Sequence, residues 1–130
     1  MSHPSPAEQR INQACRQAVA GKLAMRELAV WVRPVGLSEA EFRLLWSLVK
    51  LGDSGAGAPA EQSALAVQLA ASPAQVSMLV ERLRLKGLIE CSRASDRRRQ
   101  AWRLTKAGGE TIARVVGVVA AAALPQEEAA

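Results

Sequence analysis

Three segments of this sequence carry the residues of a helix capping box, and they fix where three helices begin. In a capping box a Ser oxygen accepts a hydrogen bond from the backbone amide three residues on, and a Glu or Gln there returns a bond to the amide of the Ser. The segments are Ser5–Glu8, Ser38–Glu41 and Ser72–Gln75. Pro6 and Pro73 follow two of these caps, where a fixed φ suits the first helical turn. The sequence therefore predicts helices that begin near these three caps.

The first helix is expected over residues 6–32, and its apolar side chains recur at heptad spacing. This spacing is typical of a helix that packs along another helix. Several of the repeating residues are small, which allows a close approach, and Pro34 with Gly36 then ends the helix. The two interleaved series are Ile11, Ala18, Met25 and Val32, and Ala14, Gly21 and Leu28.

A second helix is expected from the Ser38 cap to Gly52. Leu37 precedes the cap and is placed to pack on Phe42 as a hydrophobic staple. The small residues 52–59 that follow indicate a loop. The buried face of this helix is predicted to consist of Phe42, Leu45, Trp46 and Val49.

Residues 60–86 carry the pattern of two helices joined by a tight turn at residues 70–73. In the second of them, residues 73–86, apolar side chains at i, i+3, i+4 and i+7 form one buried face, and Gly87 ends the helix. The buried side chains are Val76, Leu79, Val80 and Leu83. The side chains left to point outward are Gln75, Ser77, Met78 and Arg82.

Two short strands are expected next, at residues 88–91 and 100–104. They form a β-hairpin whose polar tip, residues 92–99, is rich in arginine. Thr105 then caps a last helix, residues 105–124, which is almost entirely apolar. A helix with so little polar surface needs a partner.

This order of elements predicts a mainly α-helical fold with a small β-hairpin, the winged helix-turn-helix. At 130 residues the chain is expected to form a single domain, residues 1–130. The DNA-binding core is predicted at residues 60–104. The flanking helices, residues 6–32 and 105–124, are candidate dimerisation helices, so we expect a homodimer.

Positive charge is concentrated in one part of the chain. The segment from Arg82 to Lys106 contains nine basic and two acidic residues, a charge of +7, whereas the whole chain carries +5. The remaining residues therefore sum to −2, and the basic excess lies in the hairpin and the end of the helix before it. Such an asymmetry indicates binding to an anionic polymer, here double-stranded DNA.

The outward side chains of residues 73–86 suit base recognition in the major groove. Gln75, Ser77 and Arg82 can reach base edges, and Met78 can contact a thymine methyl group. The arginines of the hairpin tip are expected to lie along phosphates or to enter the minor groove. They are Arg93, Arg97, Arg98 and Arg99.

The sequence resembles the MarR family, the multiple antibiotic resistance regulators of bacteria. The likeness is carried by LAVQLAASPAQVSMLVERLRLKGLIE, residues 65–90, and by DRRRQAWRLTKAG, residues 96–108. It covers roughly residues 37–119 and extends loosely to the first helix. The resemblance implies DNA contacts at Ser77 and Arg82.

The resemblance further implies that Asp96, Arg97 and Arg98 form the wing motif, and that the protein represses transcription. Members are often released from DNA by small phenolic ligands or by thiol oxidation, and their ligand pocket lies between the dimerisation helices and the DNA-binding lobe. The chain departs from the family at Met78, where a basic residue is frequent. The family also continues into a further helix that clasps the partner subunit, whereas this sequence ends soon after Leu124, so a smaller dimer interface is expected.

The residue inventory argues against an enzyme or a metal site. The single histidine, His3, lies in the polar N-terminal tail, and no Ser-His-Asp or Cys-His set can be assembled. The glycine-rich residues 52–57 lack the lysine and the preceding strand of a phosphate loop. Cys15 and Cys91 lack metal-ligand spacing and are interpreted as small buried hydrophobic residues, with a redox-sensing thiol as the alternative. No cofactor is expected.

No signal peptide or membrane span is indicated, so a cytoplasmic location is expected. One alternative function remains open. The winged helix can be a protein-interaction module, with the arginine-rich tip as a solvated loop. DNA binding predicts a steep loss of affinity with salt, whereas a protein-interaction module does not.

Overall fold

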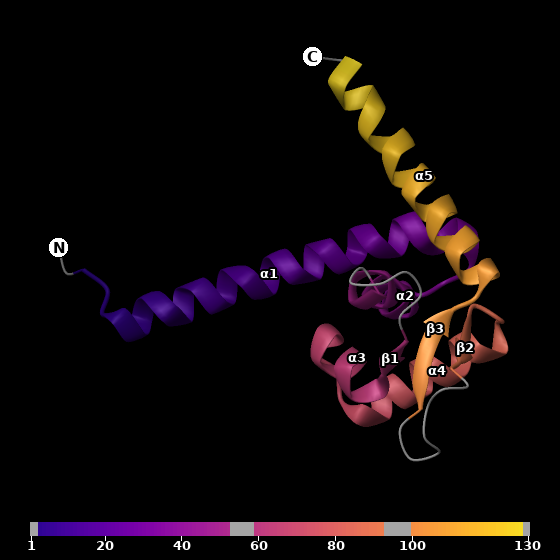
Figure 1. The fold of residues 1–130 in the computed structure, drawn as a ribbon. Helices are drawn as coiled ribbons and strands as arrows, with labels where there is room; N and C mark the ends of the chain where they lie inside the picture. Colours follow the sequence, from indigo (N-terminus) through magenta and orange to yellow (C-terminus); the bar gives the residue numbers. More distant parts are fainter. Residues whose placement is uncertain (1–2, 53–58, 93–99, 129–130) are drawn as a thin grey trace.

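The computed structural model describes residues 3–52, 59–92 and 100–128. Long helices flank a smaller body of short helices and a sheet (Figure 1). In chain order the elements are α1 (Pro6–Val32), the 3-10 helix η1 (Arg33–Val35), α2 (Glu39–Leu51), β1 (Ala60–Glu61), α3 (Gln62–Leu69), α4 (Pro73–Leu85), β2 (Ile89–Cys91), β3 (Ala101–Leu104) and α5 (Lys106–Glu128). The predicted winged helix-turn-helix order is confirmed.

The capping boxes of α2 and α4 are formed in full. Ser38 and Ser72 each accept from the amide three residues on, and the side chain at that position bonds back to the amide of the Ser. At α1 only half of the box forms. Ser5 accepts from the Glu8 amide, but the Glu8 carboxylate accepts from the Ser5 hydroxyl and not from its backbone amide.

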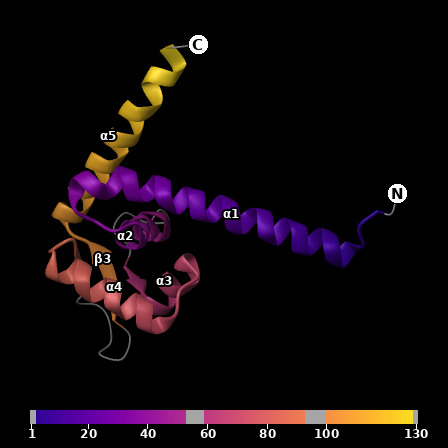
Figure 2. The same cartoon turned by 180° about the vertical axis from the view of Figure 1, so that it is seen from behind.

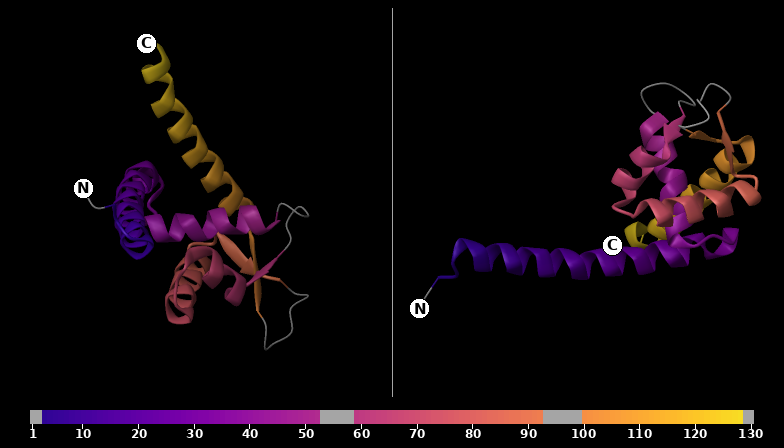
Figure 3. Two further views of the ribbon diagram at one scale, coloured as in Figure 1. Left: turned by 90° about the vertical axis from the view of Figure 1, so that its left-hand side faces the viewer. Right: turned by 90° about the horizontal axis from the view of Figure 1, so that it is seen from below.

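The long helix α1 projects beyond the rest of the molecule (Figure 3). Residues 3–27 are exposed, and burial begins only at Leu28, where the helix reaches α2 and α5. Of the predicted heptad series, Val32 is fully buried, whereas Ile11 and Met25 are 62% and 43% exposed. Within the described part of one chain, most of the heptad face of α1 therefore packs against nothing.

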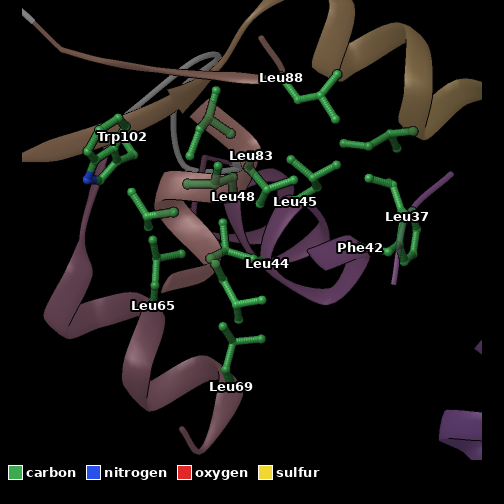
Figure 4. Packing of buried hydrophobic residues seen from close by; sticks show 14 of the residues in the cluster. Leu37, Phe42, Leu44, Leu45, Leu48, Leu65, Leu69, Leu83, Leu88 and Trp102 are labelled. Atoms are coloured by element: carbon green, nitrogen blue, oxygen red, sulfur yellow. The ribbon is translucent and has the colours of Figure 1, made fainter. Parts of the chain in front are cut away.

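The core lies where α2, α3 and α4 meet (Figure 4). Leu44, Leu45, Leu65, Val76 and Leu83 are fully buried there. This corrects the face predicted for α2, because Trp46 is 38% exposed while Leu44 and Leu48 are buried. The reason is tertiary: α2 contacts α1, α3, α4, α5 and β3, so it is buried on several sides and not along one stripe.

The predicted hairpin is present, and a third short strand joins it. The strands are antiparallel in the order β1-β3-β2. β1 was not foreseen, because two residues are too few for an alternating pattern, and its Ala60 pairs with Trp102 of β3. Across β2 and β3, Arg103 Nε lies 3.0 Å from Glu90 Oε1.

A network of short hydrogen bonds joins the end of α4 to the start of α5. Gly87 adopts a φ of +74°, and the amide of Leu88 bonds to the carbonyl of Leu83 at 3.1 Å, which closes α4 as the sequence predicts. Thr105 caps α5 by accepting from the Gly108 amide at 3.1 Å. Its hydroxyl also donates to the Gly87 carbonyl at 2.7 Å, which links the two helix ends.

The helix α5 runs to Glu128, four residues past the expected end near Leu124. Pro125 removes one amide donor, which weakens a helix without necessarily ending it. Ile112 and Val115 are buried, whereas Val116 is 49% exposed. Within the described residues no helix alone is long and apolar enough to cross a membrane; only α3 and α4 together pass that test, and they are bent by 108°.

The contact between α5 and Leu88, the residue before β2, leads to a stability prediction. A Cβ atom at Gly108 would overlap the backbone carbonyl of Leu88, so Gly108→Ala is expected to lower the free energy of unfolding by about 2 kcal/mol. Gly109 is the matched control: nothing lies within 4 Å of a Cβ placed there, and Gly109→Ala should stabilise the helix by up to about 1 kcal/mol. Urea unfolding midpoints measure both. A neutral Gly108→Ala would contradict the close approach.

Candidate nucleic-acid interface

The helix α4 lies at the surface, away from the free end of α5 (Figure 2). Its inner side chains are buried as the sequence predicts and anchor it to the core. Its outer side remains open along the length of the helix. The buried residues are Val76, Leu79, Val80 and Leu83.

The four residues of α4 that the sequence predicts to contact bases are all exposed, but they do not lie on one side of the helix. Gln75, Met78 and Arg82 recur at i, i+3 and i+7, so they lie on one side of the helix. Ser77 lies further round, beside α3, and its hydroxyl donates to Oε1 of Gln62 at 3.2 Å. Gln62 was not singled out from the sequence, because its contact spans fifteen residues.

The basic residues near α4 differ in whether they already have a partner. Arg84 Nη2 lies 2.7 Å from Glu81 Oε1, and this hydrogen bond lowers the pKa of the Glu81 carboxyl. Arg82 forms no ion pair with any residue that the structure describes. Arg82 is therefore the cation of α4 that is available to an external phosphate or base.

Lys86, which directly follows α4, is held against the start of α2. Its Nζ lies 2.9 Å from Glu41 Oε2 and donates to the Gly36 carbonyl at 3.1 Å. Glu41 is 5% exposed, and its Oε1 accepts from the Ser38 amide at 3.0 Å. Burial raises the pKa of this carboxyl, but the hydrogen bonds from Lys86 and Ser38 outweigh burial and lower the pKa overall. The pair fixes the C-terminal end of α4 to α2.

The predicted wing contacts lie outside the described residues. These are Arg93, Arg97, Arg98 and Arg99, together with Asp96. The described strands β2 and β3 run up to this segment from both sides, and the Ser92 amide bonds to the Ala101 carbonyl at 2.8 Å. The roles of these four arginines stay predictions.

An apolar cavity of about 620 Å³ lies between α1, α2 and α5. Three of the chain's four aromatic residues line it, Trp31, Phe42 and Trp46, and the last two stack with ring centroids 6.1 Å apart. Arg43 also lines it, with its Nε 2.6 Å from Glu39 Oε2. This is where the family resemblance places a ligand pocket, and the sequence alone did not identify these lining residues.

A second cavity, of about 490 Å³, lies between α1 and the turn that joins α3 to α4. Met25 lines it from α1, and Gln75 and Met78 line it from α4. Two of the predicted reading residues therefore turn partly toward α1.

The interpretation of both cysteines as buried residues is wrong. Cys15 is exposed because it lies on the projecting part of α1, and Cys91 is exposed at the end of β2, on an edge of the sheet. Among the described residues, no group of three or more His, Cys, Asp or Glu side chains is placed to hold a metal ion.

Comparison with known proteins places this fold. No family model and no curated protein matches the chain. Solved structures do match: the transcriptional regulator BldR of Sulfolobus solfataricus gives a TM-score of 0.73 at 19% identity, over 89% of this chain and 80% of that one. A MarR family transcriptional regulator of Silicibacter pomeroyi gives 0.72 at 24% identity, over 92% and 78%. This chain has the MarR fold.

A MarR mutant from E. coli, solved in complex with operator DNA, also matches, with a TM-score of 0.70 at 19% identity over 89% of this chain and 79% of that one. The resemblance noted in the sequence is thereby confirmed at the level of the fold. In the MarR fold of this chain, α3 and α4 form the helix-turn-helix and the strands β2 and β3 flank the wing.

The Lys86–Glu41 pair leads to a prediction about stability and pH. Lys86→Met leaves a buried carboxylate without its cation, so the free energy of unfolding at pH 7 should fall by about 2 kcal/mol. The folded pKa of Glu41 lies below its ordinary value of 4.5. The pair's contribution is therefore complete above that value and is lost as the pH falls through the folded pKa.

Urea titrations from pH 7 to pH 3 measure this effect. The difference between wild type and Lys86→Met should shrink once Glu41 is protonated. Arg84→Met is the control, since it breaks an exposed pair and should change nothing measurable. If Lys86→Met lowered the free energy of unfolding equally at every pH, the loss could not come from the ion pair with the Glu41 carboxylate.

Proposed function

We propose that this protein is a sequence-specific double-stranded DNA-binding transcriptional regulator, acting as a repressor, and not an enzyme. In this proposal α4 enters the major groove, and the wing, residues 92–99, contacts the backbone or the minor groove. The observation that carries the proposal is the open outer side of α4. It presents Arg82, the first residue of the segment of charge +7, which has no ion-pair partner among the described residues.

The ion pairs of the structure sharpen which charges are available to DNA. Three of the basic residues between Arg82 and Lys106 are paired with carboxylates of the chain: Arg84, Lys86 and Arg103. Arg82 and Lys106 have no such partner among the described residues. Phosphate binding is therefore assigned to these two and to the four arginines of the wing.

The MarR fold of known DNA-bound regulators supports this proposal over the protein-interaction alternative. The E. coli MarR mutant of this fold was solved with operator DNA, and a transcriptional regulator of M. tuberculosis, whose TM-score is 0.63 at 19% identity, was solved with DNA. A solvated arginine loop would not require an exposed outer side with Gln75 and Arg82 on the neighbouring helix.

Salt dependence tests the proposal. Fluorescence anisotropy with labelled duplex should show affinity falling steeply with salt, with a log-log slope of roughly −0.9 per phosphate contact. Arg97→Ala/Arg98→Ala should reduce the magnitude of this slope by about 2 and weaken binding to all sequences. Arg10→Ala/Arg16→Ala removes the same charge from the exposed part of α1 and should leave the slope unchanged. Absence of binding by the wild type at low salt would favour the protein-interaction alternative.

We also propose a homodimer built on α1 and α5. The support is the apolar surface that a single chain leaves open on these helices. These residues are Ile11, Val19, Leu23, Met25, Val30 and Val116. A projecting helix is marginal in water without tertiary packing, so the exposed length of α1 favours a partner.

Light scattering at micromolar concentration should give twice the chain mass of 13.8 kDa. Ile11→Glu places a charge on the apolar surface and should shift the mass toward one chain, because burying a charge at a helix interface is costly. Gln13→Glu, on the same exposed part of α1, introduces the same charge and should remain dimeric. A monomeric wild type would rule out the dimer.

A further inference from the structure

Two of the reading side chains on α4 already use one of their polar atoms inside the protein. Oε1 of Gln75 accepts from the Ser72 amide at 3.0 Å in the capping box. The hydroxyl of Ser77 donates to Oε1 of Gln62 at 3.2 Å. The Ser77 bond uses the only hydrogen of its hydroxyl, and the Gln75 bond turns the amide oxygen toward the cap, so Nε2 is the atom of Gln75 that the cap leaves for a base.

Ser77 is left as an acceptor. A serine hydroxyl has one donor hydrogen and two lone pairs, and a freely rotating hydroxyl can pair with either kind of base edge. Because Gln62 takes the only hydrogen, the Ser77 oxygen presents lone pairs to the groove. In the major groove the donors that can meet it are the amino groups of cytosine and adenine.

Gln75 is left as a donor. Its amide oxygen points back to the N-terminus of α4, while its Nε2 retains two hydrogens. The bidentate Gln–adenine pair needs both halves of the amide on the base, so it would require the cap to open. With the cap closed, Gln75 suits base acceptors, which are guanine O6 and N7, thymine O4 and adenine N7, and it disfavours cytosine, which has only a donor at this edge.

We propose that Gln62 and the Ser72 cap determine base specificity, because they fix whether Ser77 and Gln75 act as hydrogen-bond donors or acceptors toward DNA. This inference rests on the proposed DNA-binding function. Gln62, which lies on α3, makes Ser77 an acceptor for an amino-bearing base. The Ser72 amide makes Gln75 a donor for a base with an acceptor edge. Gln62 is in this sense a positioning residue, since it acts through Ser77.

The experiment is selection of bound duplexes from a randomised pool, followed by affinity measurements on single-base variants of the selected site. Ser77→Ala identifies the base pair that Ser77 reads, as the position where the preference disappears. At that position the wild type should prefer an amino-bearing base by roughly tenfold over guanine or thymine. Gln62→Ala frees the hydroxyl to rotate, and the preference there should fall below about threefold.

Two further variants test whether the base preference depends on the hydrogen-bond acceptor at position 62 or only on the presence of a side chain there. Gln62→Glu still offers an acceptor to the Ser77 hydroxyl, so the base preference should persist even if overall affinity falls. Gln68→Ala changes the other glutamine of α3, which is exposed, and should alter neither affinity nor preference. Loss of the preference in Gln62→Glu as well as in Gln62→Ala would overturn the polarity argument.

The cap at Gln75 is tested by Gln75→Glu. The carboxylate can still accept from the Ser72 amide, so the helix start is retained, but the donor that faces DNA becomes an acceptor. At the base pair read by Gln75, the wild type should disfavour cytosine, which has only a donor at this edge. Gln75→Glu should instead disfavour guanine and thymine, which have only acceptors there. Gln68→Glu controls for the added charge and should keep the wild-type site.

The outcomes distinguish the two proposals. If the wild type enriches no sequence above the random pool, sequence-specific binding fails and the polarity proposal fails with it. If the wild type selects a site but Gln62→Ala and Gln75→Glu select the same site with unchanged preferences, DNA reading stands and the polarity proposal is overturned.

Discussion

The packing of α4 onto α2 and α3 is the constraint on which the rest of the molecule depends. It buries the apolar stripe of α4 and thereby determines which side of the helix faces outward. The Lys86–Glu41 pair fixes the far end of α4 to α2, and the Ser72 cap fixes the near end to the preceding turn. Held at both ends, the helix presents its side chains from a rigid support, which the proposed reading of bases would require.

The same structure divides the basic residues by role. Charges that are paired inside the chain hold elements together, as Lys86 does between α4 and α2 and Arg103 does between β3 and β2. Arg82 has no such partner among the described residues and is left for an external anion. The pairs differ in strength, because Glu41 is buried whereas the partners of Arg84 and Arg103 are about half exposed. Lys86 is therefore the basic residue of this segment that the fold holds most firmly.

The long helices serve a different purpose from the compact body. Only the last part of α1 is buried, and α5 leaves apolar surface such as Val116 open, which is the surface that the proposed homodimer would cover. Where they meet α2 they line an open apolar pocket together with most of the chain's aromatic side chains. The aromatic residues that are so few in this sequence are thus gathered at the junction between the projecting helices and the helix-turn-helix.

The sequence by itself determined the features that depend on neighbours within a few residues: the caps at Ser38 and Ser72, the turn at Gly87, and the apolar stripe of α4. These follow from backbone amides and side-chain periodicity, which are local. Only the tertiary structure decided that Trp46 is exposed, that a third strand pairs with the hairpin, and that Gln62 bonds to Ser77. Those features depend on residues that are distant in the chain and meet only when the helices pack, and no local pattern encodes which distant side chain will be the partner.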